Sequence, residues 1–284
     1  GQLFNPTFLS VSVWAFFILC SASSANYLFN DVLDAAADRK HPFKKFRPVA
    51  SGKLPSTMAL STAVFLILFS LLAASLVNPS FFAITFLFLI LEFSYSLFLK
   101  KLAVIDILAI TLAYILRVYA GEIATGFHIS IWLFLTVLSL SLFLAIGKRR
   151  AEITLLEGYS GAVLKDTRET LSHYSERLLD VYISMTAAST WIAYAFYAFL
   201  GKTETSGWFS TGPWSGFVSV LPERKWLMLT IPFVLFGIMR YVQLIYEQHQ
   251  GESPERVLTS DWPLMITILG WGLTVIFIIY GLGG

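Results

Sequence analysis

The 284-residue sequence is 56% hydrophobic and only 13% charged, with a net charge of +2 and a single cysteine. Soluble domains usually carry about 25% charged residues, so this composition excludes an ordinary soluble protein and indicates a polytopic membrane protein. The small net charge provides no basic field of the kind that nucleic-acid-binding proteins have, so we expect no nucleic-acid partner. The lone Cys20 excludes an intrachain disulfide.

Segments long enough to span a membrane recur along the whole chain. A helix that crosses the bilayer needs about 20 mostly apolar residues. We therefore expect an all-α polytopic membrane protein, a helix bundle that forms one domain over residues 1–284. The eight predicted helices are Phe8–Phe29, Thr57–Val77, Ser80–Leu99, Ala103–Thr125, Ile129–Gly147, Ser175–Leu200, Trp226–Glu247 and Pro263–Leu282.

The polar connections between these segments alternate in their content of lysine and arginine. The basic connections lie near residues 30–55, 100–101, 148–174 and 248–262. The connections with few basic residues lie near 78–79, 126–128 and 201–225. Because cytoplasmic loops are enriched in Lys and Arg, the basic connections are predicted to face the cytoplasm. We expect a multi-pass protein of the cell (inner) membrane with its active site on that side.

The stretch "NDVLDAAADRKHPFKKFRP" follows the first apolar segment directly. Its Asp31, Asp34 and Asp38 are spaced i, i+3 and i+7, which places three carboxylates on one face of a helix, with Asn30 on the same side. Hard cations relieve the repulsion among such carboxylates, and Mg²⁺ typically binds one or two carboxylates together with substrate phosphates. We predict that the three aspartates are catalytic ligands of Mg²⁺.

Cations follow these aspartates at close spacing. They are Arg39, Lys40, Lys44, Lys45 and Arg47. They are candidates for binding the remaining phosphate charge of a substrate. A solvated cytoplasmic loop would also contain such cations, but it would not require regularly spaced aspartates beside an apolar helix.

A second polar region begins at "GKRRAE", with Lys148, Arg149, Arg150 and Glu152 at the end of an apolar helix. Phosphate recognition and simple anchoring at the cytoplasmic surface are the two interpretations.

The stretch "HYSERLLDVY" follows, with Glu176 and Asp180 at i and i+4 and Tyr174 close by. The two carboxylates face one side of a helix, where they either form part of a site or stabilise the positive end of the helix dipole.

Charged residues also occur within the apolar segments. A central Arg117 costs about 2.5–3.5 kcal/mol in a membrane helix and is expected to face the bundle interior with a partner. Of the acidic residues on the same segment, Asp106 lies on roughly the same face but too far along the helix to pair directly, and Glu122 is not well aligned. Pairing through another helix is therefore expected. Glu92 is a similar case, and the neighbouring Tyr95 is a candidate for a hydrogen bond to a sugar or phosphate. The four histidines have no metal-ligand spacing.

The motif "NDVLDAAAD" resembles the NDxxDxxxD motif of the UbiA superfamily of intramembrane prenyltransferases. The extension "DRKHPFKKFRPVASG" resembles one branch, the decaprenyl-phosphate phosphoribosyltransferases. That likeness continues in "LAYILRVYAGEIAT", "LFLAIGKRRAE", "PFVLFGIMRY" and "GESPERVLTSDWPL". The resemblance implies nine helices, so we interpret the abrupt start at "GQLFNP" as a missing first helix.

The resemblance implies Mg²⁺-dependent transfer of phosphoribose from phosphoribosyl pyrophosphate (PRPP) to a polyprenyl phosphate, a step toward cell-envelope arabinan. It also implies a second aspartate motif, for which Glu176 and Asp180 are the nearest match, and a lid in the loop flanked by Arg240 and Asp261. The expected substrate-binding residues are Asn30, Arg39, Lys44, Arg47, Tyr95, Arg117, Lys148, Arg149, Glu152, Tyr174, Asp180 and Arg240.

Three functions stay open at this point. The first is the phosphoribosyl transfer just described, and the second is prenyl transfer from a prenyl diphosphate to an aromatic or other acceptor. The third is a non-enzymatic transporter or membrane scaffold, which would tolerate loss of Asp34. The sequence leaves homo-oligomerisation open.

Overall fold

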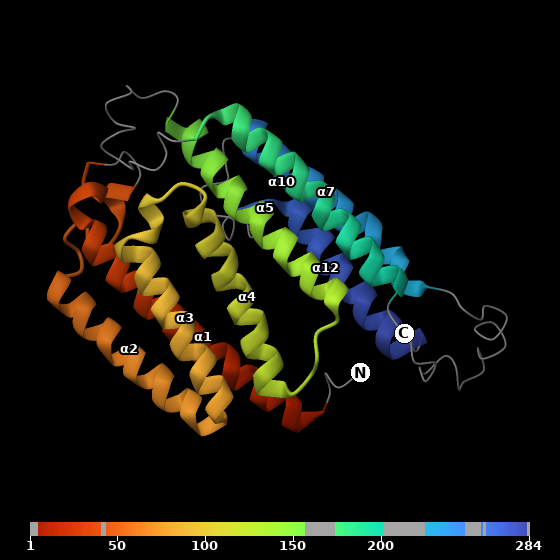
Figure 1. Ribbon diagram of the computed structural model, residues 1–284, viewed down its shortest axis with the longest axis horizontal. Coiled ribbons are helices and arrows are strands. Elements are labelled where there is room, and N and C mark those ends of the chain that lie inside the picture. Colours follow the sequence, from red (N-terminus) through yellow and green to blue (C-terminus); the bar gives the residue numbers. More distant parts are fainter. Residues whose placement is uncertain are drawn as a thin grey trace. The chain divides into compact units, whose positions relative to one another are not determined.

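The computed structural model describes residues 5–40, 44–156, 174–200, 225–247, 257 and 260–282. The long elements of these residues are all helices (Figure 1). They are α1 (Pro6–Asp38), α2 (Ser56–Val77), α3 (Pro79–Leu97), α4 (Ile105–Thr125), α5 (Ile131–Leu156), α7 (Glu176–Leu200), α10 (Ile231–Glu247) and α12 (Trp262–Ile276). Short 3₁₀ turns cover Lys44–Phe46, Leu99–Lys101 and Trp226–Thr230, and a π-helical turn covers Phe277–Leu282.

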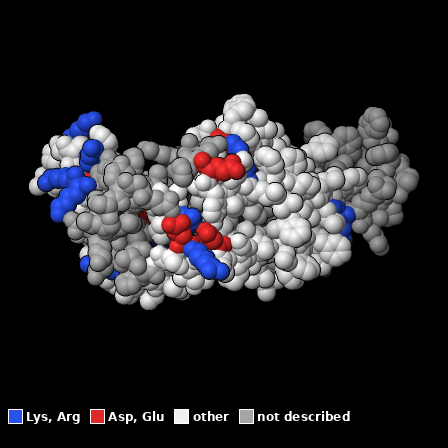
Figure 2. Space-filling model, turned by 90° about the horizontal axis from the view of Figure 1, so that it is seen from above, with Lys and Arg blue, Asp and Glu red and all other residues white. Residues whose placement is uncertain are grey.

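Within the described residues, eight helical segments are long and apolar enough to cross a membrane, which confirms the predicted number and fold class. Their outer surfaces carry large apolar side chains such as Leu72, Leu76 and Met239. In Figure 2, charged side chains gather in a few groups and broad areas of the visible described surface carry none. This distribution suits a surface that faces lipid.

Two predicted helix boundaries were wrong. The first predicted helix ended at Phe29, but α1 continues to Asp38 and so includes all three aspartates. The fifth ended at Gly147, but α5 continues to Leu156 and includes the "GKRRAE" residues. Hydropathy finds only the apolar part of a helix, whereas backbone hydrogen bonding continues through polar stretches that contain good helix formers, such as the alanines at 35–37 in α1 and the lysine and arginines at 148–150 in α5.

The chain forms two compact units. The N-terminal unit comprises Gln2–His128 with Leu156–Ser175, and the C-terminal unit comprises Ile129–Leu155 with Glu176–Gly284. The first therefore contains α1 to α4, and the second contains almost all of α5 together with α7, α10 and α12. The expectation of a single domain over residues 1–284 stays a prediction.

Small side chains allow the helices of the N-terminal unit to approach closely. Ala15, Ile18, Ala74, Phe81 and Ala120 form one buried cluster of this unit. Close backbone approach through small residues is a common way for helices to associate in lipid.

The turn into α3 is fixed by a single asparagine. The side chain of Asn78 accepts a hydrogen bond from the backbone N–H of Phe81 at 2.7 Å and donates one to the carbonyl of Ile123 at 3.3 Å. The first contact caps α3, and the second ties the beginning of α3 to the end of α4.

The C-terminal unit is held by aromatic contacts and one close approach. The indole of Trp271 donates a hydrogen bond to the hydroxyl of Tyr194 at 2.7 Å, which joins α12 to α7. A Cβ atom at Gly147 would lie 3.0 Å from both Ile245 Cδ1 and Tyr241 Cε1. Glycine therefore allows α5 and α10 to pack closely just before the basic residues of α5.

Candidate active site

The polar end of α1 carries its acidic residues in two neighbouring rows. With 3.6 residues per turn, Asp31 and Asp38 lie almost in line, and Asn30 and Asp34 form an adjacent row. The side chains of Asp31 and Asp34 are partly exposed, at 23% and 30%, whereas that of Asp38 is 7% exposed. The three carboxylates therefore share one side of the helix, as predicted, but they face different partners.

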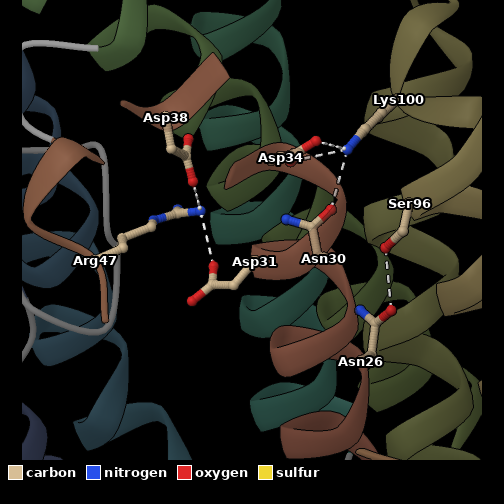
Figure 3. Close-up of polar contacts among 8 residues, drawn as sticks. All are labelled: Asn26, Asn30, Asp31, Asp34, Asp38, Arg47, Ser96 and Lys100. Atoms are coloured by element: carbon tan, nitrogen blue, oxygen red, sulfur yellow. Dashed lines mark hydrogen bonds and ion pairs between the residues drawn. The ribbon is translucent and has the colours of Figure 1, made fainter. Parts of the chain in front are cut away.

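Arg47 binds the first row. Its Nη1 lies 3.0 Å from Asp31 Oδ1 and 3.0 Å from Asp38 Oδ2, so one nitrogen bridges the two carboxylates (Figure 3). The connection after α1 is folded back to permit this, because Val49 is buried in a cluster with Ala35 of α1 and Ala59 of α2. Arg47 was predicted to bind phosphate, and in this structure it neutralises the acidic row.

Lys100 binds the second row, and the sequence analysis missed this role. Its Nζ lies 2.6 Å and 2.8 Å from the two carboxylate oxygens of Asp34 and 3.1 Å from the amide oxygen of Asn30 (Figure 3). Its side chain is 11% exposed. The available signal was that Lys100 lies on the same predicted side of the membrane as the aspartates. We call Asn30, Asp31, Asp34, Asp38, Arg47 and Lys100 the acidic cluster.

A further ion pair joins α3 and α4. Arg117 of α4 donates to Glu92 of α3 at 3.3 Å, and its guanidinium lies over the rings of Phe88 and Tyr114. Pairing through another helix was expected, and Glu92, which the sequence analysis had treated separately, is the partner. The described structure thus shows Arg117 in an interhelical ion pair, and its role in substrate binding stays a prediction.

The two acidic residues of α4, Asp106 and Glu122, have other partners. Glu122 lies 3.0 Å from the ring of His128. Asp106 is fully buried and accepts a hydrogen bond of 2.7 Å from the hydroxyl of Tyr174. Neither carboxylate forms an ion pair with Arg117 in the structure.

Tyr174 holds the turn before α4. Its hydroxyl also accepts a hydrogen bond from the backbone N–H of Val104, whose φ of +69° is rare for a β-branched residue. Tyr174 is itself only 7% exposed. Its hydroxyl is therefore engaged with the protein, and its predicted contact with substrate stays a prediction.

In the C-terminal unit, the two arginines of α5 bind acidic side chains. Arg149 is 1% exposed and donates to Glu152 at 2.6 Å, one turn along the same helix. A buried, paired arginine does not match the alternative of anchoring at the membrane surface. Arg149 and Glu152 can contact a substrate only where a binding site reaches this buried pair.

Arg150 lies at the centre of a second group of side chains. Its Nε donates to Asp180 at 2.9 Å and its Nη2 to Glu176 at 3.0 Å, while its Nη1 donates to Thr154. The ring of Tyr246 lies beneath the guanidinium, and its hydroxyl donates to Asp180. We call these five residues the arginine cluster; here Glu176 and Asp180 hold a cation that the protein itself supplies.

Arg240 and Asp261 form an ion pair in the same unit. Nε and Nη2 of Arg240 lie 3.1 Å and 2.7 Å from the two oxygens of Asp261. Asp261 also caps α12 by accepting from the backbone N–H of Leu264 at 2.9 Å. The hydrogen bonds from Arg240 lower the pKa of Asp261 below its usual value, and the bond from Leu264 adds to this.

The remaining predicted residues are Arg39, Lys44, Tyr95 and Lys148. Arg39 follows α1 and donates to the carbonyl of Ala50 at 3.1 Å. Lys44, Tyr95 and Lys148, on the turn after α1, on α3 and on α5, are each partly exposed. Residues 201–224 and most of the predicted lid at 248–262 lie outside the described residues.

The acidic cluster fits a divalent cation by the chemistry of its donors. Carboxylate and amide oxygens are the ligands that Mg²⁺ prefers, and the nitrogen shared by Asp31 and Asp38 shows that a positive charge can lie between them. In the part of the chain that the structure describes, no three His, Cys, Asp or Glu side chains form a ready metal site. Asp34 faces Lys100 instead, so the structure does not bring the three carboxylates to one point.

The chain resembles known proteins over nearly its whole length. Residues 1–260 match the UbiA prenyltransferase family. A decaprenyl-phosphate phosphoribosyltransferase of Mycobacterium tuberculosis (strain CDC 1551 / Oshkosh) is 33% identical over 94% of this chain and 81% of its own. The enzyme of that name from Corynebacterium glutamicum is also 33% identical, over 98% of this chain and 78% of its own.

The fold has a solved counterpart. The structure of a UbiA homolog from Archaeoglobus fulgidus bound to GPP and Mg²⁺ superposes with a TM-score of 0.68, at 19% identity, over 94% of this chain and 87% of that chain. The eight apolar helices of the described residues and the match to the UbiA family define an integral, multi-pass membrane protein. The chain belongs to the UbiA prenyltransferase family, and it is an enzyme of the transferase class.

Proposed function

We propose that this enzyme transfers 5-phosphoribose from PRPP to a polyprenyl phosphate, releases pyrophosphate and depends on Mg²⁺. The observation that carries the proposal is the identity of 33% over 94% of the chain to an enzyme named for phosphoribosyl transfer to decaprenyl phosphate. The acidic cluster supports it, because hard oxygen ligands beside two cations suit a diphosphate with its metal ion. We propose that the site faces the cytoplasm of the cell membrane.

Asp31, Asp34 and Asp38 would hold the Mg²⁺, which supplies positive charge to the diphosphate leaving group. Lys100 would exchange part of its contact with Asp34 for an oxygen of that diphosphate, because its ammonium lies beside the proposed metal ligands. Arg47 would do the same from the other row, because its guanidinium side chain is 37% exposed. These charges stabilise the leaving group as the bond between ribose C1 and the pyrophosphate oxygen breaks.

The reaction balances without a base. The bond from C1 to pyrophosphate breaks and pyrophosphate leaves with the electron pair, while an oxygen of the polyprenyl phosphate forms a new bond to C1. That oxygen is already an anion, so no residue has to remove a proton. This agrees with a cluster made of carboxylates, an amide and cations. Arg39, Lys44, Tyr95, Arg117, Lys148, Arg149, Glu152, Tyr174, Asp180 and Arg240 stay candidates for contacts with the two substrates.

A second candidate function has its own support. The solved structure with the same fold is bound to GPP, a prenyl diphosphate, and Mg²⁺. The acidic cluster would bind the diphosphate of such a donor by the same chemistry, and the product would be a prenylated acceptor. The two functions therefore differ in the donor that the enzyme accepts.

Donor choice is the direct test. Purified protein is incubated with polyprenyl phosphate, Mg²⁺ and radiolabelled PRPP, and label is counted in the organic phase. We expect label in the lipid from the wild type and none from Asp34→Ala. Folded protein that leaves PRPP untouched but consumes a prenyl diphosphate with an aromatic acceptor would establish the second function instead.

A further inference from the structure

Polar side chains of α1 and α3 contact one another at successive turns. On α1 they are Asn26, Asn30 and Asp34, and on α3 and the turn after it they are Glu92, Ser96 and Lys100. The members of each set are four residues apart, so each set forms a row along its helix. The contacts join Asn26 to Glu92 and Ser96, and they join Lys100 to Asn30 and Asp34. We call these six residues the polar ladder, of which Figure 3 draws all but Glu92.

Asn26 makes two contacts that fix its height along α3. Its Nδ2 donates to Glu92 Oε2 at 2.6 Å, and its Oδ1 accepts from Ser96 Oγ at 3.0 Å. Glu92 and Ser96 lie one turn apart on α3, so a short amide can reach both at only one relative height of the two helices. Asn26 and Ser96 are 6% and 2% exposed, so water has little access to replace either contact.

The apolar contacts beside the polar ladder restrict the position of α1 along α3 less than the hydrogen bonds do. Ala22 of α1 lies in a cluster with Phe88, Leu89 and Ala113. In a bilayer, the free energy of an apolar side chain changes little when it moves from protein to acyl chains. Hydrogen bonds and close packing therefore determine how two helices pair. Alanine has only a small side chain with which to oppose sliding of α1 along α3.

Lys100, in contrast, cannot set the height by itself. Its long side chain has several rotatable bonds and could follow Asp34 through a small displacement of α3. The contacts of Lys100 therefore follow the register of the helices. Glu92 also accepts a hydrogen bond from Arg117 of α4 at 3.3 Å. The carboxylate that binds Asn26 is therefore held by α4 as well.

We infer that Asn26 is a positioning residue that sets the register between α1 and α3 and so presents Lys100 to Asp34 at the height needed to bind the donor diphosphate. The part of the inference that concerns the donor rests on the proposed function. The part that concerns the register does not.

Crosslinking measures the register directly. The rings of Phe29 on α1 and Phe93 on α3 have centroids 4.8 Å apart, so cysteines in their places should be joined by a short thiol crosslinker. The experiment compares Phe29→Cys/Phe93→Cys with Phe29→Cys/Leu97→Cys, one turn farther along α3, in a Cys20→Ser background. The ratio of the two yields in membranes, without substrate, reports the register.

Removal of the Asn26 contacts should change that ratio. At about threefold for each interhelical hydrogen bond lost, we expect Asn26→Leu to lower the preference for position 93 by about tenfold and Ser96→Ala by about threefold. Ser70→Ala is the matched control, because Ser70 is equally buried but donates only to the carbonyl of Ile67 in its own helix. A ratio that stays at the wild-type value in both ladder variants overturns the inference.

Kinetics separate positioning from a general loss of stability. We expect Asn26→Leu to raise the KM for the donor by about tenfold, with the KM for the acceptor lipid unchanged, and Ser96→Ala to give a smaller rise. In a Lys100→Met background, Asn26→Leu should add nothing further, because it acts through Lys100. Independent, multiplying effects of the two substitutions would overturn the positioning role.

Different results would contradict the proposed function and the inference about Asn26. If the wild type accepts a prenyl diphosphate rather than PRPP, the proposed function has failed, and the same cycle is then measured with that donor. If the crosslinking ratio does not respond, the inference has failed whatever the donor. Should Asn26→Leu not fold, Ser96→Ala against Ser70→Ala decides alone.

Discussion

The acidic cluster and the arginine cluster both combine carboxylates with arginine, yet they differ in how the cation is held. In the acidic cluster, Arg47 extends from the connection after α1, its side chain is 37% exposed, and its Nη1 serves both carboxylates. In the arginine cluster, Arg150 projects from α5, its side chain is 9% exposed, and Nε, Nη1 and Nη2 each have a partner.

This difference separates a site that can exchange its cation from one that is already complete. A guanidinium on a connecting segment can withdraw when a metal ion and a diphosphate arrive, at little structural cost. Removal of Arg150 would instead take one guanidinium away from both Glu176 and Asp180, beside the ring of Tyr246. We therefore expect the acidic cluster to govern catalysis and the arginine cluster to govern stability.

The largest effect should come from Asp34→Ala in the acidic cluster. Loss of this carboxylate removes a proposed metal ligand and a partner of Lys100, so we expect turnover to fall by at least about 10²–10³-fold. Label transfer to lipid measures the change. Glu122→Gln is the control, because Glu122 is an acidic residue of the same unit whose carboxylate contacts the exposed His128. Equal losses in both variants would contradict an assignment specific to the cluster.

Lys100→Met should have the next largest effect. A hydrogen bond to a charged group contributes about 1.5–3 kcal/mol, so we expect the affinity for the donor diphosphate to fall by about 10–100-fold. The KM for the donor and protection from heat by the donor with Mg²⁺ both measure this change. Lys101→Met is the matched control, since Lys101 is the adjacent, exposed lysine. The role of Lys100 is wrong if the two variants behave alike.

Arg150→Met should act on stability. Glu176 and Asp180, which both lose the guanidinium, are 45% and 40% exposed, so water offsets part of the cost and we expect a loss of about 1–3 kcal/mol. Thermal unfolding in detergent measures it. The loss should be the same with and without Mg²⁺, because the cluster holds its own cation. A variant that unfolds normally but needs more Mg²⁺ would move the metal site toward Asp180.

The smallest effect should come from the ion pair of Arg240 and Asp261. The pKa of Asp261 is lowered from 3.8, mainly by its hydrogen bonds with Arg240, so the pair stabilises the fold above about pH 4. This stabilisation is lost as the pH falls through the lowered pKa. Asp261→Asn should therefore unfold at a slightly lower temperature at pH 7, and the difference from wild type should shrink in acid. A constant difference across this range would show that the cap on α12 matters and the charge does not.

The fold was largely predictable from the sequence, because about 20 apolar residues in succession have few alternatives to a membrane-spanning helix. The ends of α1 and α5 were not, since charged residues such as Lys148 continue a helix without adding to hydropathy. The spacing of the aspartates predicted their shared face but not their division between two cations.

The partners of the charged residues were the part that the sequence could not supply. Lys100 meets Asp34 across 66 residues, and Arg117 meets Glu92 across 25. Helical spacing reveals neighbours on one helix, and contacts between helices depend on how they pack. For Arg117 that limit directed attention to Asp106 and Glu122, whose partners proved to be Tyr174 and His128.

The length of α1 has a consequence for how the two substrates could meet. Its 33 residues make a rod of about 50 Å, whereas the hydrocarbon layer is about 30 Å thick. Unless the helix is strongly tilted, its acidic end stands in the headgroup zone, beyond the acyl chains. A water-soluble sugar diphosphate would then react without losing its hydration shell in the hydrocarbon layer. The isoprenoid tail would stay in the bilayer while its phosphate reaches the headgroup zone. One continuous helix would thus connect the two solvents from which the reactants come.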